Sequence, residues 1–441
     1  MSPQADAPLT HRRIFRIAAP IVLSNATFPI LGAVDTGVVG QMGLAAPIGA
    51  VGVGAIILST LYWTFGFLRM GTTGLVAQAR GAGDAAEAGA LLMRGLMIGA
   101  AGGALFILSQ VLLFRGAFAL APASDEVETL ARAYMSIRIQ GAPATIALYA
   151  VTGWLIAQER TTGVLILQLW MNGLNILLDV VFVLGFGWGV EGVALATLVA
   201  EWTGLALGLW LCRAAFAGRQ WRNLGRVFDP SRLRRMLAVN TDLMIRSVLL
   251  TLSFAAFLFL GAGLGDVTLA ANQVLLQFLQ ITAFALDGFA FAAEALVGAA
   301  VGAGARGRLR RVAVMTAQWA AGAALALGVL FFALGPVLID LMSTAPEVRL
   351  TARAYLFWAA LAPAIGAAAW MLDGIYIGAT WTREMRRMMV LSVVVYAGAT
   401  AVLLPVFGNH GLWGALMVLN AARGVTLGWR YPGLEAGVGR R

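Results

Sequence analysis

The chain alternates long apolar runs with short polar or glycine-rich breaks. Each run holds about 20 residues or more, the length that an α-helix needs to cross the hydrocarbon core of a bilayer. The pattern argues against strands, because open sheet edges cannot be satisfied in lipid and the runs are far too long for the strands of a barrel. The pattern predicts an all-α polytopic membrane protein with twelve transmembrane helices. The expected spans lie near residues 14–40, 48–78, 90–114, 128–157, 162–186, 190–212, 237–262, 269–302, 310–335, 347–379, 388–407 and 411–430.

Composition excludes several other classes of protein. Hydrophobic residues make up 60% of the 441 residues and charged residues only 12%, too few for the surface of a soluble domain. The single cysteine, Cys212, cannot form an intrachain disulfide, and His11 and His410 stand in no metal-ligand spacing. No arrangement of serine, histidine and an acid suggests hydrolysis. We therefore expect no enzyme activity, no metal and no cofactor. The first apolar run is of spanning length, so no removed signal peptide is expected.

Arginine residues gather on one side of the predicted membrane plan. With an even number of spans the two termini share a side, and that side holds most of the arginines, whereas the opposite loops are largely acidic. The positive-inside rule then places both termini in the cytoplasm. Because these arginines stand in loops between spans, they indicate topology and not a nucleic-acid surface. The arginine-rich segments are 12–16, 213–235, 306–311 and 383–387.

The sequence repeats internally at a constant shift of 221 residues, the separation of Arg132 and Arg353. The segment "DEVETLARAYMSIRIQGAPA" at 125–144 returns as "PEVRLTARAYLFWAALAPA" at 346–364. In the same register, "GLVAQARGAG" at 74–83 matches "ALVGAAVGAG" at 295–304. Several matches at one shift indicate two related halves.

The repeat predicts the domain organisation. We expect two pseudo-symmetric six-helix lobes at residues 1–212 and 237–441, joined by a cytoplasmic basic linker at 213–236. Each half has an even number of spans, so both halves enter the membrane from the same side and form parallel repeats. That is a known plan of alternating-access carriers, which bind their substrate between the halves.

Four polar residues are expected to meet near the outer ends of spans in the first half. Asp35 lies five residues before the end of the first span. Asn175 and Asp179 are four residues apart and therefore share one face of the fifth span. Thr197 stands at a similar depth in the sixth span. Acids inside spans are costly and commonly functional, and two neighbouring carboxylates can share one proton.

This group admits three interpretations. It can relay a proton, or its carboxylates, amide and hydroxyl can hold a sodium ion. It can also be a polar cluster that merely positions three helices. The positions related to Asp35 and Asp179 by the repeat are Ala256 and Thr400, so the acid pair exists in the first half alone. A structural pair would more plausibly survive in both halves, and the asymmetry therefore favours a function.

Three ionisable residues form a second group, in the inner layer of the C-terminal lobe. Arg246 belongs to the seventh span, Glu294 to the eighth and Asp373 to the tenth. An arginine between two buried acids can be a structural ion cluster, because unpaired charges in a span are costly. Alternatively, its rearrangement sets the balance between inward-open and outward-open states and makes the group an inner gate.

Long segments of the chain resemble the multidrug and toxic compound extrusion transporters of the DinF-like branch. The resemblance extends over nearly the whole chain. It is carried by "PLTHRRIFRIAAPIVLSNATFPILGAVDTGVVGQMG" at 8–43, "RMGTTGLVAQARGAGD" at 69–84, "DVTLAANQVLLQFLQITAFALDGFAFAAEALVGAAVGAG" at 266–304 and "LDGIYIGAT" at 372–380.

This resemblance implies a carrier of two six-helix lobes that exports organic, often cationic, compounds in exchange for protons or sodium ions. It also implies a coupling-cation site at Asp35, Asn175, Asp179 and Thr197. The implied location is a bacterial-type inner membrane, with small organic substrates and membrane lipids as partners of a monomer. Two alternatives remain: a flippase of lipid-linked precursors, which would favour a strongly cationic cavity, and a membrane scaffold or receptor that transports nothing.

Overall fold

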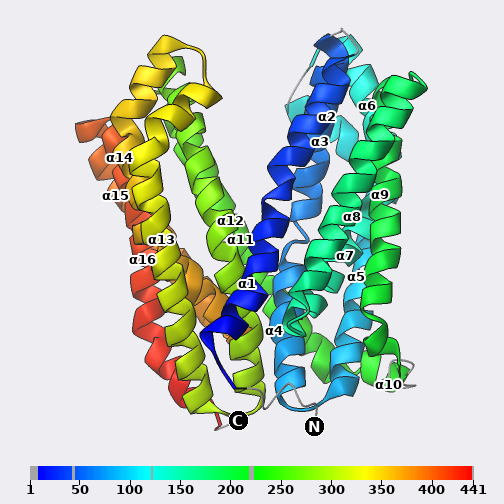
Figure 1. Cartoon of the computed structure of the whole chain (residues 1–441), viewed down its shortest axis with the longest axis vertical. Coiled ribbons are helices and arrows are strands. Elements are labelled where there is room, and N and C mark those ends of the chain that lie inside the picture. Colours follow the sequence, from blue (N-terminus) through cyan, green and yellow to red (C-terminus); the bar gives the residue numbers. More distant parts are fainter. Residues whose placement is uncertain (1–7, 42–44, 121–122, 218–222, 440–441) are drawn as a thin grey trace. The chain divides into compact units, whose positions relative to one another are not determined.

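A computed structural model describes residues 8–41, 45–120, 123–217 and 223–439 (Figure 1). The described chain is helical and contains no strand, which confirms the predicted all-α class. The first half contains α1 (His11–Asn25), α2 (Thr27–Gly40), α3 (Ala45–Trp63), α4 (Phe67–Gly81), α5 (Ala85–Leu120), α6 (Asp125–Arg138), α7 (Ala142–Ala157), α8 (Thr161–Asp179) and α9 (Gly189–Leu211). The short α10 (Leu224–Val227) precedes α11 (Pro230–Ala262), α12 (Asp266–Gly302), α13 (Arg306–Met342), α14 (Pro346–Ala379), α15 (Thr382–Phe407) and α16 (Asn409–Gly437).

Ten helical segments of the described residues are long and apolar enough to cross a membrane. They correspond to ten of the twelve expected spans. The first expected span forms two shorter helices, α1 and α2, which meet at Ala26. The last forms one continuous helix, α16, whose apolar stretch is interrupted by Asn420 and Arg423. Both side chains are buried in the protein, so the interruption does not face lipid.

The break between α1 and α2 follows from a proline near the start of α2. Pro29 has no backbone N–H, and its ring collides with the carbonyl group four residues earlier, that of Asn25, when a helix continues through both. The hydroxyl of Thr27 donates a hydrogen bond to the carbonyl oxygen of Ser24 at 2.7 Å. This bond joins the first residue of α2 to the last turn of α1 across the break.

The helices themselves repeat at the shift found in the sequence. Corresponding helices of the two halves begin at residues that this shift relates, so the internal repeat of the sequence is a repeat of structure. The paired first residues are Ala45 and Asp266, Ala85 and Arg306, Asp125 and Pro346, and Thr161 and Thr382.

A close helix contact also repeats. A Cβ atom added to Gly153 in α7 would lie 2.5 Å from the carbonyl oxygen of Arg69 in α4. A Cβ atom added to Gly374 in α14 would lie 2.6 Å from the carbonyl oxygen of Ala290 in α12. The same shift relates the two glycines to each other and the two carbonyl groups to each other. Each half therefore uses a glycine to bring a corresponding pair of helices together, α4 with α7 and α12 with α14. Such close contacts at glycine are common in membrane helix packing.

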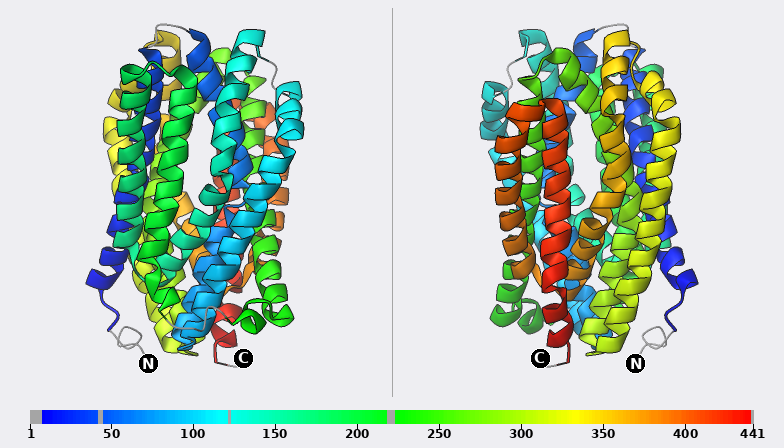
Figure 2. Two further views of the ribbon diagram at one scale, coloured as in Figure 1. Left: turned by 90° about the vertical axis from the view of Figure 1, so that its right-hand side faces the viewer. Right: turned by 90° about the vertical axis from the view of Figure 1, so that its left-hand side faces the viewer.

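Contacts within the chain divide it into two compact units. The first unit comprises Leu23–Val76 and Asp84–Arg234. The second unit comprises the residues up to Val22, Ala77–Gly83 and the residues from Arg235 on. In the first unit α5 packs against α7, and α8 against α9. In the second, α12 packs against α13 and α14, and α16 lies beside α15 (Figure 2). The expected lobe boundaries at 212 and 237 stay a prediction.

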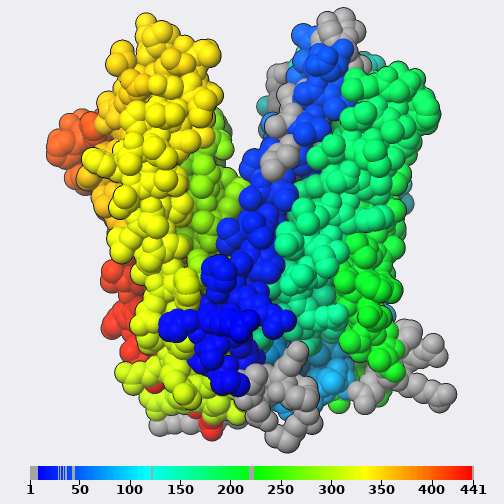
Figure 3. All heavy atoms as spheres, viewed as in Figure 1, coloured from blue at the N-terminus to red at the C-terminus, as the bar shows by residue number. Residues whose placement is uncertain are grey.

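Exposed helix faces are apolar, as contact with lipid requires. On α13, which runs along the surface of its unit (Figure 3), Leu325, Val329 and Phe332 are 61%, 70% and 71% exposed. Their spacing of four and three residues places them on one face of the helix. A soluble protein rarely exposes such a continuous apolar stripe, and the stripe therefore marks a membrane-facing surface.

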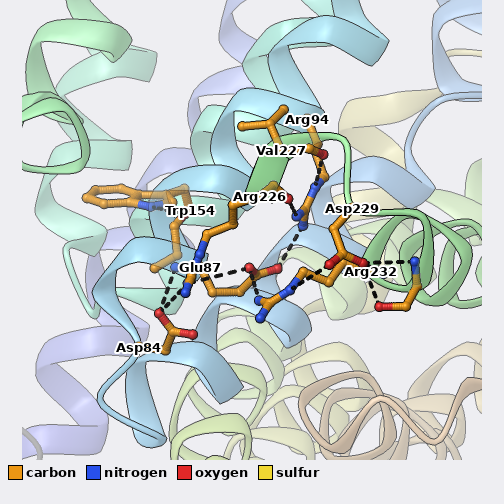
Figure 4. A network of polar contacts seen from close by, with 10 residues as sticks. Asp84, Glu87, Arg94, Trp154, Arg226, Val227, Asp229 and Arg232 are labelled. Carbon is orange, nitrogen blue, oxygen red and sulfur yellow. Dashed lines mark hydrogen bonds and ion pairs between the residues drawn. The ribbon is translucent and has the colours of Figure 1, made fainter. Parts of the chain in front are cut away.

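The segment before α11 is fastened to the start of α5 by ion pairs (Figure 4). Arg226 in α10 lies 2.7 Å from Asp84, and Arg232 pairs with Glu87. Arg94 in α5 donates to the carbonyl oxygens of residues 226 and 227 at 2.7 and 2.8 Å, and to Glu87 at 2.7 Å. The acids at the start of α5 thus hold part of the basic linker.

These contacts change the acidity of Asp84, which lies between α4 and α5. Partial burial opposes the change, but two hydrogen bonds to Oδ1, from the backbone N–H of Glu87 and from Arg226, lower the pKa of Asp84 below its usual value. The carboxylate form of Asp84 is therefore the form that holds α10 in place.

Candidate functional site

A polar face of α8 crosses the interior of the first unit. Gln168, Asn172, Asn175 and Asp179 follow at intervals of four, three and four residues and therefore share one side of the helix. The amide of Gln168 donates to Asn172 Oδ1 at 2.8 Å, and Asn172 Nδ2 donates to Thr27 Oγ1 at 2.8 Å. Gln168 and Asn172 were missed by sequence reasoning, although the same spacing that links Asn175 to Asp179 includes them.

The structure brings Asn175 and Thr197 together. Asn175 Nδ2 donates to Thr197 Oγ1 at 3.1 Å, and this hydroxyl donates to the carbonyl oxygen of Val193. Asp179 lies one turn further along α8 and is wholly buried. Asn175 Oδ1 is buried and has no hydrogen-bond partner among the described residues. An amide oxygen, a hydroxyl and a carboxylate are oxygen donors that can bind either a proton or a hard cation.

Asp179 stands at the point where α8 changes its helical form. Residues Val180–Gly185 form a π-helix, in which the backbone N–H bonds reach one residue further back than in an α-helix. Phe182 within this π-helix packs its ring against those of Phe186 and Trp188, which follow it, with centroids 5.0–6.2 Å apart. π-helical turns frequently occur at functional sites, because they redirect the side chains next to them.

Asp35 belongs to α2, but its side chain lies outside the described part of the structure. Its backbone position can still be compared with that of Asp179. α2 packs against α8, and Thr27 at the start of α2 bonds Asn172. Three expected spans lie between these two helices, so both run in the same direction. Asp35 is eight residues beyond Thr27 and Asp179 is seven beyond Asn172, so their backbones rise about 12 and 10 Å from that contact.

An ion pair in the same unit was not predicted. Arg138 at the end of α6 lies 2.6 Å from Glu201 in α9, and their side chains are only 12% and 7% exposed. The hydroxyl of Tyr62 donates to the carbonyl oxygen of Arg138 at 3.1 Å. Glu201 is one turn from Thr197, and the pair therefore extends the polar face toward α6. Arg138 well inside the span 128–157 and Glu201 well inside the span 190–212 were the available signal.

The second unit holds a buried ion cluster. Arg246 in α11 pairs with Asp373 in α14, so two of the three residues expected there meet. Arg423 in α16, which sequence reasoning missed, lies 2.5 Å from the same oxygen of Asp373. Glu294 in α12 is buried, but it does not line the pocket formed by these three residues. A separate pair joins Asp242 to Arg386 at 2.7 Å.

Comparisons with known proteins agree on one family. A family model described as MatE matches residues 20–181 and 243–402. The chain is 38% identical to DNA damage-inducible protein F of Escherichia coli over 426 residues, which cover 95% of this chain and 92% of the relative. It is 28% identical to a probable multidrug resistance protein NorM of Xanthomonas axonopodis, over 71% of this chain and 68% of that one.

Solved structures of the same family share the fold. The crystal structure of the MATE transporter VcmN of Vibrio cholerae in its bent form matches with a TM-score of 0.87 and 20% identity, over 97% of both chains. An outward-facing MATE family transporter of the MOP superfamily matches with a TM-score of 0.82 and 20% identity, over 97% of this chain and 96% of that one. At this identity the likeness concerns the fold alone.

Proposed function

Because the chain belongs to the multidrug and toxic compound extrusion family, in its DinF-like branch, we propose that it exports amphipathic or cationic organic compounds in exchange for protons. The family consists of multi-pass membrane transporters of small organic compounds, which need no cofactor and are not enzymes. The coupling ion and the substrate class are the parts that we propose here.

The observation that carries the proposal is the position of Asp179. Its side chain is wholly buried, next to Asn175 and one turn from the bond between Asn175 and Thr197. Desolvation disfavours the charged form of an acid, so a carboxyl group in such surroundings gains and loses a proton as its access to water changes. We propose that Asp35 supplies the second carboxyl group and that the pair shares the coupling proton.

Sodium is the second candidate ion, and the orphan oxygen of Asn175 favours it. Asn175 Oδ1 is buried without a hydrogen-bond partner among the described residues, and a bound cation would satisfy it. The other oxygen donors would be Thr197 Oγ1 and the carboxylates of Asp35 and Asp179. We prefer the proton, because it needs one carboxyl group and not a complete shell of oxygen ligands.

We further propose an arrangement in the membrane. Both termini, and the basic linker at 213–236, lie in the cytoplasm, and the protein acts as a monomer in a bacterial inner membrane. The supporting observation is the distribution of arginine, which favours the side of the termini. We also propose that Arg246, Glu294 and Asp373 act as an inner gate, whose contacts change between inward-open and outward-open states.

Transport by purified protein in liposomes tests the coupling. Ethidium, a fluorescent organic cation, serves as the substrate, and a proton gradient and a sodium gradient are imposed separately at equal membrane potential. We expect the proton gradient alone to drive ethidium accumulation. Accumulation driven only by the sodium gradient would replace the proton with sodium at the same residues. If neither gradient drives ethidium accumulation, cation coupling is refuted.

A further inference from the structure

A small pocket lies inside the second unit, whereas the proposed cation site belongs to the first. It is formed by α11, α14, α15 and α16, and its free space is about that of one water molecule. The charged residues that line it are 9% exposed or less. The remaining wall is apolar. The lining residues are Arg246, Asp373, Arg423, Met385, Met388, Met389 and Leu427.

Positive charge exceeds negative charge around this pocket. Arg246 and Arg423 both donate to one oxygen of Asp373, Oδ2, so two guanidinium groups share one carboxylate oxygen. Two other buried acids of this unit do not add to the charge of the pocket: Glu294 in α12 does not line it, and Asp242 pairs with Arg386 at 2.7 Å and accepts from Thr382 at 3.0 Å. A charge that is enclosed in a membrane protein without compensation is costly.

Hydrogen-bond donors are in excess as well. Nε of Arg246 and Nε of Arg423 are buried and have no hydrogen-bond partner among the described residues. Arg423 also donates to Asn420 Oδ1 at 3.1 Å, which leaves Nδ2 of Asn420 buried without a described partner. These three buried donors, two of which belong to the guanidinium groups themselves, require an acceptor.

We propose that this pocket binds one small monovalent anion of the size of chloride. A halide adds one negative charge, and it accepts several hydrogen bonds at once without a preferred direction. With free space of about one water molecule, the pocket is closer in size to a halide than to a carboxylate or a phosphate group, so we assign it neither a lipid headgroup nor an anionic substrate. Met385, Met388 and Met389 have flexible side chains, which let the pocket adapt to an ion slightly larger than water. The site is independent of the proton coupling proposed for the N-terminal half.

Bromide in crystals of the unmodified protein tests the site directly. Bromide replaces chloride chemically and scatters anomalously, so its position can be located without any substitution. We expect an anomalous peak between Arg246 and Arg423. The absence of a peak there, in crystals that show bromide elsewhere, would refute the proposal. This result does not depend on transport, so it is separate from a failure of the proposed function.

Thermal unfolding of the purified protein gives the second measurement. At constant ionic strength, replacing gluconate by chloride should raise the Tm along a saturating curve, by about 3 °C at 100 times the Kd. Arg423→Gln should abolish this chloride effect. Arg353→Gln is the matched control, because the side chain of Arg353 is 42% exposed, pairs with Asp340 and does not line the pocket. A rise that does not saturate, or that persists in Arg423→Gln, would overturn the site. If Arg423→Gln fails to fold, Arg246→Lys takes its place. The bromide peak in the unmodified protein then decides: its presence supports the site and its absence refutes it.

Discussion

Removal of Arg138 should destabilise the protein strongly, because it leaves the buried carboxylate of Glu201 without its ion partner. The two side chains are 2.6 Å apart and only 12% and 7% exposed. Oε2 of Glu201 already has no hydrogen-bond partner among the described residues. Removing one partner of a buried pair costs about 3–5 kcal/mol, since the remaining charge is left uncompensated.

The size of the effect can be expressed as a change in Tm. An unfolding entropy of about 2.1 cal/mol/K per residue gives about 0.9 kcal/mol/K for a chain of 441 residues. Arg138→Met should therefore lower the Tm by about 3–5 °C. The matched control is Glu128→Gln, which breaks the pair between Glu128 and Arg132, whose side chains are 31% and 37% exposed. An exposed pair of this kind contributes about 0.3–0.5 kcal/mol, so the control should change the Tm by less than about 1 °C.

The assay is thermal unfolding in detergent, followed by tryptophan fluorescence. The double variant Arg138→Met/Glu201→Leu should recover most of the lost stability, because replacing both members of a buried pair by apolar residues is often nearly neutral. Equal Tm values for Arg138→Met and Glu128→Gln would refute the reasoning. A double variant that is less stable than Arg138→Met would also contradict it.

Three further predictions concern topology, the linker and the second ion cluster. A cysteine at Gly307, where an added Cβ meets no other atom, should react with impermeant reagents only from the cytoplasm, and one at Ser124 only from outside; labelling of Gly307 from outside would overturn the twelve-span plan. The pKa of Asp84 is lower in the folded protein than in the unfolded one. The stability that its carboxylate gives to the contact with α10 is therefore complete above the unfolded pKa and is lost as the pH falls below about 4. Hydrogen exchange, corrected for intrinsic rates, should therefore show constant protection of α10 from pH 7 to 5 and weaker protection below about pH 4, and constant protection down to pH 2 would contradict this. Arg246→Ala should shift the distribution of spin-label distances across the cytoplasmic ends of the two halves several-fold between states, whereas an unchanged distribution with a lower Tm would identify a purely structural cluster.

Much of the fold could be predicted, because the bilayer restricts it. Spans must be long, apolar and helical, so their positions follow from hydropathy alone. The shift that relates the two halves likewise appears in both the sequence and the helix bounds. The break at Ala26 was not predicted, although Pro29 is its cause, because a proline in a membrane span can also be accommodated by a continuous kinked helix.

The site was predicted in part, for a reason that concerns distance along the chain. The pairing of Asn175 with Thr197 followed from depth in neighbouring spans, and the structure contains it. The ion pair between Arg138 and Glu201 joins residues 63 positions apart, and single charges in separate spans do not reveal which of them meet. Arg423 was missed for the same reason, although it shares Asp373 with a residue that was predicted.

The most direct test of proton coupling compares driven export with exchange in liposomes that contain the Asp179→Asn variant. Asparagine keeps the shape of the side chain and its capacity for hydrogen bonds but cannot titrate. The matched control is Asp340→Asn. Asp340 lies at the end of α13, and its side chain is 38% exposed and pairs with Arg353 in α14. We predict that Asp179→Asn loses ethidium export driven by a proton gradient but retains ethidium exchange in the absence of a gradient, whereas Asp340→Asn retains both. Export by Asp179→Asn at the rate of the unmodified protein across pH 6 to 8 would contradict the account.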